Sequence, residues 1–239
     1  MDTEKSLKDM ISECKNIVFF GGAGVSTASG IPDFRSANGL YKAANGQAYP
    51  PEKMLSLSFF KKYPEAFYQY YFENLVYDDA KPNAAHYALS KLEAEGKLKA
   101  IITQNIDGLH QKAGAKKVYE IHGSMMSNTC MNCGETYSLE ALKEKYYCPK
   151  CNGLIKPDVT LYEEGLDMTV YNGAVKKIAE ADMLIVGGTS LVVYPAAYLV
   201  DYFKGRYLIL INQTPTNQDS RATVVYRDSI AKVLAEAIQ

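Results

Sequence analysis

Two pairs of cysteines have the spacing of ligands for a metal ion. Four of the five cysteines form two Cys-x-x-Cys pairs, 14 residues apart: Cys130, Cys133, Cys148 and Cys151. Four thiolates fill the tetrahedral shell of Zn²⁺ and leave no position for water, so we expect a structural zinc. A dithiol redox pair would need only one Cys-x-x-Cys, and an iron–sulfur cluster is a second alternative. The fifth cysteine, Cys14, we expect to be buried in a helix.

A glycine-rich loop, Gly21 to Gly30, follows the first predicted strand. Glycines at such a point let the backbone approach a pyrophosphate, and a following helix N-terminus favours its negative charge. Thr27 stands where the dinucleotide fingerprint has Gly or Ala, and no strand ending in an acidic residue follows within about 20 residues. The loop therefore predicts a phosphate site but argues against a hydride-transfer enzyme. A tight strand-to-helix turn is the simpler alternative.

Polar or small residues also follow the other predicted strands. Together with three residues that follow the glycine-rich loop, the set comprises Asp33, Phe34, Arg35, Gln104, Asn105, Ile106, Asp107, His122, Gly188, Thr189, Ser190 and Asn212. Amide and carboxylate groups suit ribose hydroxyls and a carboxamide, and histidine is readily poised as a base near neutral pH. Any one of them alone could be a cap, a turn residue or a structural histidine. Because ligands of open α/β sheets bind at the carboxyl ends of the strands, their convergence predicts a binding site there.

The elements that must position these residues alternate between strands and helices. Apolar runs predict strands at 16–20, 99–103, 117–121, 183–186, 207–211 and 223–225. Helix-length segments lie at 3–14, 83–95, 171–179 and 230–238. Continuously apolar strands are typical of a parallel sheet that is covered on both faces. The pattern predicts an α/β fold, a Rossmann-like parallel sheet with helices on both faces.

Two stretches do not follow this alternation. Residues 39–81 are rich in Tyr and Phe, and residues 124–154 hold the cysteine pairs. We expect them to form a small inserted domain of a helical segment and a zinc ribbon, in which the aromatic residues pack. The larger, Rossmann-like domain would then comprise residues 1–38, 82–123 and 155–239.

The overall composition excludes several classes of protein. The chain has 239 residues, 47% of them hydrophobic, and 26 Lys and Arg against 27 Asp and Glu. This balance argues against wholesale disorder and against a basic surface for nucleic acid. The first ten residues lack the apolar core of a signal peptide, and no apolar run is long enough to cross a bilayer. We expect a soluble, cytoplasmic protein with neither nucleic acid nor a membrane as direct partner.

Taken together, five blocks of the sequence resemble the sirtuins. They are Gly22-Ala23-Gly24-x-Ser26, Gly30-Ile31-Pro32-Asp33-Phe34-Arg35, Thr103-Gln104-Asn105-Ile106-Asp107-x-Leu109-His110, Ile121-His122-Gly123 and Gly188-Thr189-Ser190. The resemblance covers nearly the whole chain in order, and its length is similar to that of the compact bacterial members. It implies an NAD-dependent protein-lysine deacetylase that consumes NAD. The implied products are nicotinamide, O-acetyl-ADP-ribose and free lysine.

The resemblance also implies a role for each site residue. His122 would be the base that helps a ribose hydroxyl close onto an imidate, and Asn105 would orient the ribose or a water. Asp107 and the backbone of Ile106 would hold the nicotinamide carboxamide, and Phe34 would shield the anomeric carbon. The remaining contacts to NAD would come from Ala23, Gly24, Thr27, Asp33, Arg35, Gln104, Gly188, Thr189, Ser190 and Asn212. The four paired cysteines would hold the family's structural zinc.

The resemblance places the acyl-lysine peptide as an added strand between residues 159–164 and 191–194. Val159 and Val193 suit a tunnel for the lysine stem, with ordinary core packing as the alternative. Glu163 stands where the family commonly has a glycine, and its charge would favour basic residues beside the acyl-lysine. Tyr71 aligns with the arginine of members that remove acidic acyl groups, so an acetyl group is expected first.

Two other functions share parts of this site. A mono-ADP-ribosyltransferase would use the same NAD pocket, but the presence of both Asn105 and His122 favours deacylation. A non-catalytic NAD-binding module that recognises peptides would bind NAD without releasing nicotinamide. The expected partners are therefore NAD and acetyl-lysine proteins or peptides, and we expect a monomer.

Overall fold

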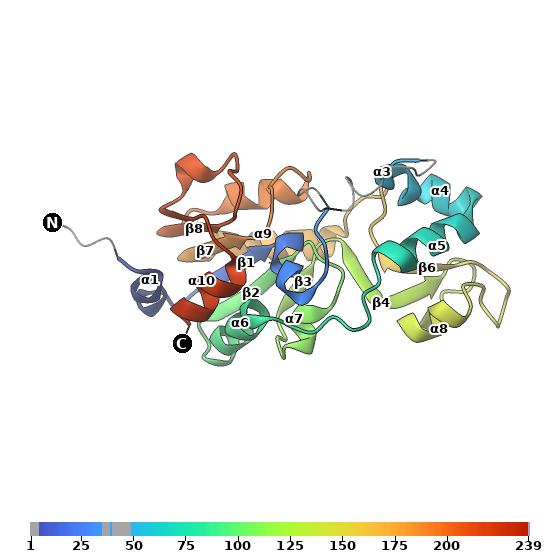
Figure 1. Cartoon of the computed structure of the whole chain (residues 1–239), viewed down its shortest axis with the longest axis horizontal. Helices are drawn as coiled ribbons and strands as arrows, with labels where there is room; N and C mark the ends of the chain where they lie inside the picture. Colours follow the sequence, from blue (N-terminus) through green and yellow to red (C-terminus); the bar gives the residue numbers. More distant parts are fainter. Residues whose placement is uncertain (1–4, 35–38, 40–48, 239) are drawn as a thin grey trace.

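A parallel sheet of six strands forms the centre of the molecule (Figure 1). The computed structural model describes residues 5–34, 39 and 49–238. The strands, in chain order, are β1 (Ile17–Gly21), β2 (Leu98–Thr103), β3 (Val118–Glu120), β7 (Met183–Gly187), β8 (Tyr207–Ile211) and β9 (Val224–Tyr226). Each matches a strand expected from the sequence within one residue at either end. Their order across the sheet, β3-β2-β1-β7-β8-β9, is that of a Rossmann fold.

The strands are continuously apolar because both faces of the sheet are covered. In β1 every residue is buried, and successive side chains point to opposite faces. Ile17 and Phe19 join one core cluster, whereas Val18 and Phe20 join another. This double burial stabilises the sheet by roughly 1.5–3 kcal/mol for each large apolar side chain removed from water.

Helices on each face complete the two cores. On one face lie α1 (Leu7–Glu13), α6 (Ala84–Ala94), α7 (Leu109–Lys112) and α10 (Ile230–Ala237); on the other lie α9 (Met168–Ala179) and the 3-10 helix η3 (Ala196–Tyr202). The four helices expected from the sequence are thus confirmed. Asn83 begins α6, because its side chain accepts a hydrogen bond from the backbone N–H of Ala85.

The glycine-rich loop leads into two 3-10 turns, η1 (Ala23–Val25) and η2 (Thr27–Ser29), and not directly into an α-helix. A further 3-10 turn, η4 (Asp219–Arg221), precedes β9. Within residues 5–34 and 49–238, every helix is too short or too polar to serve as a membrane span.

A second group of elements lies beside the six-stranded sheet, at the right of Figure 1. Its antiparallel sheet has the order β5-β4-β6, and its elements are α3 (Pro51–Met54), α4 (Leu57–Lys62), α5 (Pro64–Asn74), β4 (Gly123–Cys130), β5 (Thr136–Tyr137), α8 (Leu139–Glu144) and β6 (Ile155–Val159). Phe60, Phe67, Tyr68 and Tyr71 are among the aromatic side chains of its core. The division of the chain into two domains stays a proposal; the antiparallel sheet extends past residue 154 through β6.

Two buried histidines lie between α6 and the sheet. His110 is 1% exposed, and its ring centroid is 4.7 Å from that of His86 and 6.1 Å from that of Phe19. Nδ1 of His86 accepts a hydrogen bond from the backbone N–H of Asn83. Neither ring nitrogen of His110 finds a hydrogen-bond partner among the described residues. Burial, and to a smaller extent the nearby His86, therefore lowers the pKa of His110 to about 3.

This burial predicts that the fold loses stability as the pH falls below 6.5. An unfolded histidine takes up a proton near pH 6.5, whereas His110 stays neutral in the fold down to about pH 3. Because the unfolded state then binds more protons, the free energy of unfolding should fall by roughly 1.4 kcal/mol per pH unit for this group. Urea denaturation between pH 8 and pH 5 measures the slope. His110→Leu should flatten it, and an unchanged slope in that variant would contradict the assignment.

Candidate functional site

A cleft of about 650 Å³ lies at the carboxyl ends of the parallel strands. Its size is that of a small-molecule site. The residues expected from the sequence that line it are Ala23, Gly24, Thr27, Asp33, Phe34, Gln104, Asn105, Ile106, Asp107, His122, Val159, Gly188, Thr189, Ser190, Val193 and Asn212. Arg35 lies outside the described residues. The structure thus brings together residues that are up to 189 positions apart in sequence, although their individual roles stay predictions.

Two glycine-containing loops meet where the strand order reverses, between β1 and β7. The backbone N–H of Gly24 donates a hydrogen bond of 2.8 Å to the carbonyl oxygen of Gly188. A Cβ atom on Gly24 would lie 2.8 Å from the Cα atom of Gly188, and Gly188 itself has a φ of +61°. Neither position accommodates a side chain without movement of the backbone. This crevice is where Rossmann folds bind nucleotides.

A hydrogen-bond network orients the polar groups after β2. The Ser26 hydroxyl donates to Oδ2 of Asp107 at 2.6 Å, and Nδ2 of Asn105 donates to the Ser26 oxygen at 3.0 Å. The other carboxylate oxygen of Asp107 accepts from the backbone N–H of Leu109. The network holds Asn105 and Asp107 in fixed orientations. Sequence reasoning included Ser26 in a motif but assigned it no role, because its partners lie about 80 residues away.

His122 is the one histidine that lines the cleft among the described residues. Its Nδ1 lies 3.0 Å from the carbonyl oxygen of Gln104, which can only accept, so Nδ1 carries the proton and Nε2 is left as the basic atom. Burial lowers the pKa of this ring. The next residue, Gly123, has a φ of +75°, and a Cβ there would lie 2.0 Å from the Asp158 carbonyl oxygen. Only glycine at position 123 allows the chain to turn from His122 into β4.

The cleft also contains residues that the sequence did not single out. Among them are Asn74, Leu75, Tyr77, Met125 and Asp228. They end or follow α5, lie in β4 or precede α10, where no motif marks them. None of the described residues that line the cleft is Lys or Arg. Among these residues, therefore, no cationic side chain is available to bind an anionic ligand.

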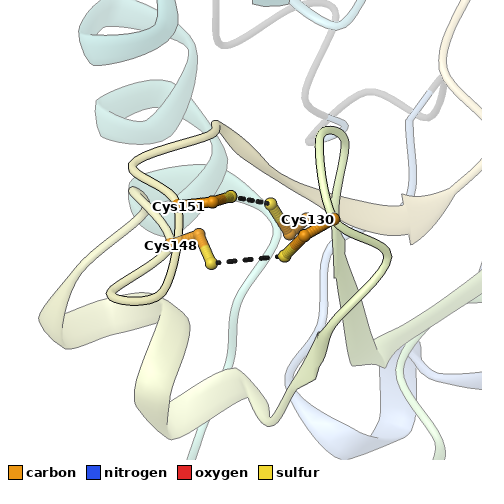
Figure 2. Close-up of side chains that lie close together, drawn as sticks. Cys130, Cys148 and Cys151 are labelled. Atoms are coloured by element: carbon orange, nitrogen blue, oxygen red, sulfur yellow. Dashed lines mark hydrogen bonds between the residues drawn. The ribbon is translucent and has the colours of Figure 1, made fainter.

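The four paired cysteines come together as the spacing predicts. Their sulfur atoms all lie within 4.8 Å of one another, and the pairs Cys130–Cys151 and Cys133–Cys148 are 3.5 and 3.6 Å apart. Figure 2 shows the two cysteine turns facing each other. Tetrahedral zinc with Zn–S bonds of about 2.3 Å requires sulfurs about 3.8 Å apart, so the donor set fits the ion. The four thiolates would close the shell of a structural zinc.

Removal of one ligand should release the zinc. Cys133 is exposed, so Cys133→Ser deletes a thiolate with little loss of packing, whereas Cys14 lies buried outside the cluster. We expect about one zinc ion per chain in the wild type and in Cys14→Ala, and far less in Cys133→Ser. Elemental analysis measures the metal, and circular dichroism with a chelator should show partial unfolding. Full zinc content in Cys133→Ser would refute the site.

The whole fold is similar to solved structures of Sir2 enzymes. A structure of a Sir2 variant with a deacetylated p53 peptide and 3'-O-acetyl ADP ribose has 38% identity and a TM-score of 0.87, and the match covers 97% of this chain and 98% of that one. A Sir2–p53 peptide–NAD+ structure has 38% identity and a TM-score of 0.82, with 95% and 94% covered.

Curated bacterial proteins are similar over their full length. The NAD-dependent protein deacetylase of Clostridium acetobutylicum is 59% identical over 242 residues, which cover 100% of this chain and 99% of that protein. The protein of the same name from Clostridium tetani is 55% identical, with 100% and 98% covered. The model of the Sir2 family matches residues 22–195. The chain therefore belongs to the Sir2 family, the sirtuins.

Proposed function

We propose that this chain is an NAD-dependent protein-lysine deacetylase. The observation that carries the proposal is the position of His122, whose basic Nε2 lies in a cleft built at the nucleotide-binding edge of a Sir2 chain. When bound, NAD supplies an electrophilic ribose carbon and a nicotinamide leaving group. The acyl group would then pass from the lysine nitrogen to a ribose oxygen of ADP-ribose, and water would complete the release of free lysine.

Each residue of the cleft has a separate role in this reaction. His122 accepts a proton from a ribose hydroxyl at Nε2, because Nδ1 is held by the Gln104 carbonyl. Asn105 orients the ribose or a water, and Asp107 binds the carboxamide with the Ile106 backbone. Ser26 fixes the orientation of Asn105 and Asp107. Apart from Arg35, which lies outside the described residues, the other residues expected to contact NAD line the same cleft, and Phe34 would keep water from the anomeric carbon.

The charge of the cleft favours a neutral acyl group. An acidic acyl group needs a cation for its carboxylate, and the described lining contains neither Lys nor Arg. Tyr71, which aligns with the arginine of the other subgroup, is fully buried and stacks on Phe67 at 5.7 Å. Val159 and Val193 line the cleft and give the lysine stem an apolar path. We therefore assign acetyl-lysine as the preferred substrate.

Mass spectrometry of an acetyl-lysine peptide with and without NAD tests the function. We expect free lysine and O-acetyl-ADP-ribose only when NAD is present, and much less product from a succinyl-lysine peptide. His122→Ala should lower kcat/KM by about 10²–10⁴, the usual contribution of a general base. As a control, that variant should keep its zinc and its thermal stabilisation by ADP-ribose. Nicotinamide release without deacetylation, or no release at all, would contradict the proposal.

The pH profile offers a separate test of the base. Burial lowers the pKa of His122, so the ring stays neutral, and able to accept a proton, below the usual pH of 6.5. The acid limb of kcat/KM should therefore have its midpoint below pH 6.5. A midpoint at or above 6.5, or the same limb in the residual activity of His122→Ala, would assign the titration to another group.

A further inference from the structure

The turn after β6 contains a residue with an unusual backbone conformation. Glu163 has a φ of +76°, in the left-handed region that favours glycine. Its side chain is exposed, so apolar packing does not explain why this conformation is kept. Some other interaction must favour glutamate here.

That interaction is with the first turn of α4. One carboxylate oxygen of Glu163 accepts the backbone N–H of Ser58 at 2.8 Å, and the other accepts the Ser58 hydroxyl at 2.9 Å. Backbone N–H groups at the start of a helix have no partner within the helix, so a carboxylate is favoured there. Both oxygens of Glu163 are thus bound to α4.

The neighbouring backbone strengthens this connection. Tyr162 donates its N–H to the Leu55 carbonyl and accepts the N–H of Leu57, each at 3.0 Å. At the start of the turn, the N–H of Thr160 donates to the carbonyl of His122 at 2.8 Å. Residues 160–165 therefore connect the backbone of the base to α4, and they line the cleft along this path.

A second carboxylate, that of Glu164, forms a hydrogen bond within the turn of residues 160–165. One oxygen of Glu164 accepts the N–H of Leu161 and pairs with the ammonium of Lys156, both at 2.9 Å. Glu164 thus shapes the turn itself, whereas Glu163 joins the turn to the helix. The two adjacent glutamates serve separate purposes.

We propose that Glu163 is a positioning residue that fastens residues 160–165 to α4 and so holds the cleft wall on which the acyl-lysine peptide binds. This inference rests on the proposed function. The expectation that the charge of Glu163 favours basic residues beside the acyl-lysine stays a separate prediction.

Two substitutions can separate the effect of the Glu163–Ser58 contact from the effect of the positive φ. Each accepts the backbone conformation at position 163, but its side chain cannot reach Ser58. Glu163→Gly and Glu163→Asn both tolerate a positive φ, and neither places a carboxylate on α4. Each should raise the KM for the acetyl peptide roughly fivefold, the size expected for one or two exposed hydrogen bonds, with kcat and the KM for NAD within about twofold. Glu163→Gln keeps an oxygen for the Ser58 N–H and an amide for its hydroxyl, so it should restore most of the affinity.

Hydrogen exchange tests the contact without any activity. Peptides covering residues 55–62 and 159–166 should exchange faster in Glu163→Gly and Glu163→Asn, whereas Glu180→Asn, on an exposed residue at the end of α9, should change neither. Adding Ser58→Ala to Glu163→Asn should not change the exchange of residues 159–166 further, because the contact with residue 163 is already lost and the other partners of the Ser58 hydroxyl are Lys53 and Ser56. An active wild type with unchanged peptide KM and exchange in both Glu163 variants would overturn the inference. Absence of NAD-dependent deacetylation in the wild type would overturn the proposed function. The hydrogen-exchange rates would still show whether Glu163 fastens the turn to α4.

Discussion

The backbone contact between Gly24 and Gly188 is the constraint on which the cleft depends. It joins the loops that leave two adjacent strands, β1 and β7, at the point where the strand order of the sheet reverses. Because a Cβ on Gly24 would lie 2.8 Å from the Cα of Gly188, any larger residue would force the two loops apart. The floor of the cleft is therefore made of backbone, and N–H groups of the main chain can face a ligand closely.

Strand β4 begins next to the proposed base, His122, and ends in the cysteine cluster. His122 precedes Gly123, the first residue of β4, and Cys130 is the last residue of that strand. β4 also pairs with β6, whose following turn is bonded to His122 at one end and to α4 at the other. A zinc that ties the cysteine turns together would also fix the end of the strand that begins next to the proposed base. The eight residues of β4 thus connect the proposed base to the cysteine cluster.

The parts that the sequence predicted are those in which local pattern and tertiary structure agree. Buried parallel strands need continuous apolar runs, and the six strands accordingly lie within a residue of their expected positions. Residues such as Gln104, His122 and Asn212 could be grouped because each follows a strand that ends at the same edge. The contact of Glu163 with Ser58 spans 105 positions and involves a helix with no motif, so it could not be foreseen. The 3-10 turns after Gly22 could not be foreseen for a similar reason, since their loop is bonded through the Gly24 N–H to Gly188, 164 positions away.

The charges around the cleft explain how it can hold a dinucleotide and a cationic reaction centre together. Within the described lining the charged side chains are acidic, among them Asp33, Asp107 and Asp228. Within the described residues, a pyrophosphate can be bound by backbone N–H groups of the glycine loops, which carry only partial positive charge, whereas Arg35, the cation expected to contact NAD, lies outside them. The acidic groups, in turn, favour the positive charge that develops on the ribose as nicotinamide leaves. A lysine placed among them would strengthen ground-state binding of NAD but oppose that developing charge, which gives a physical reason for the composition of this lining.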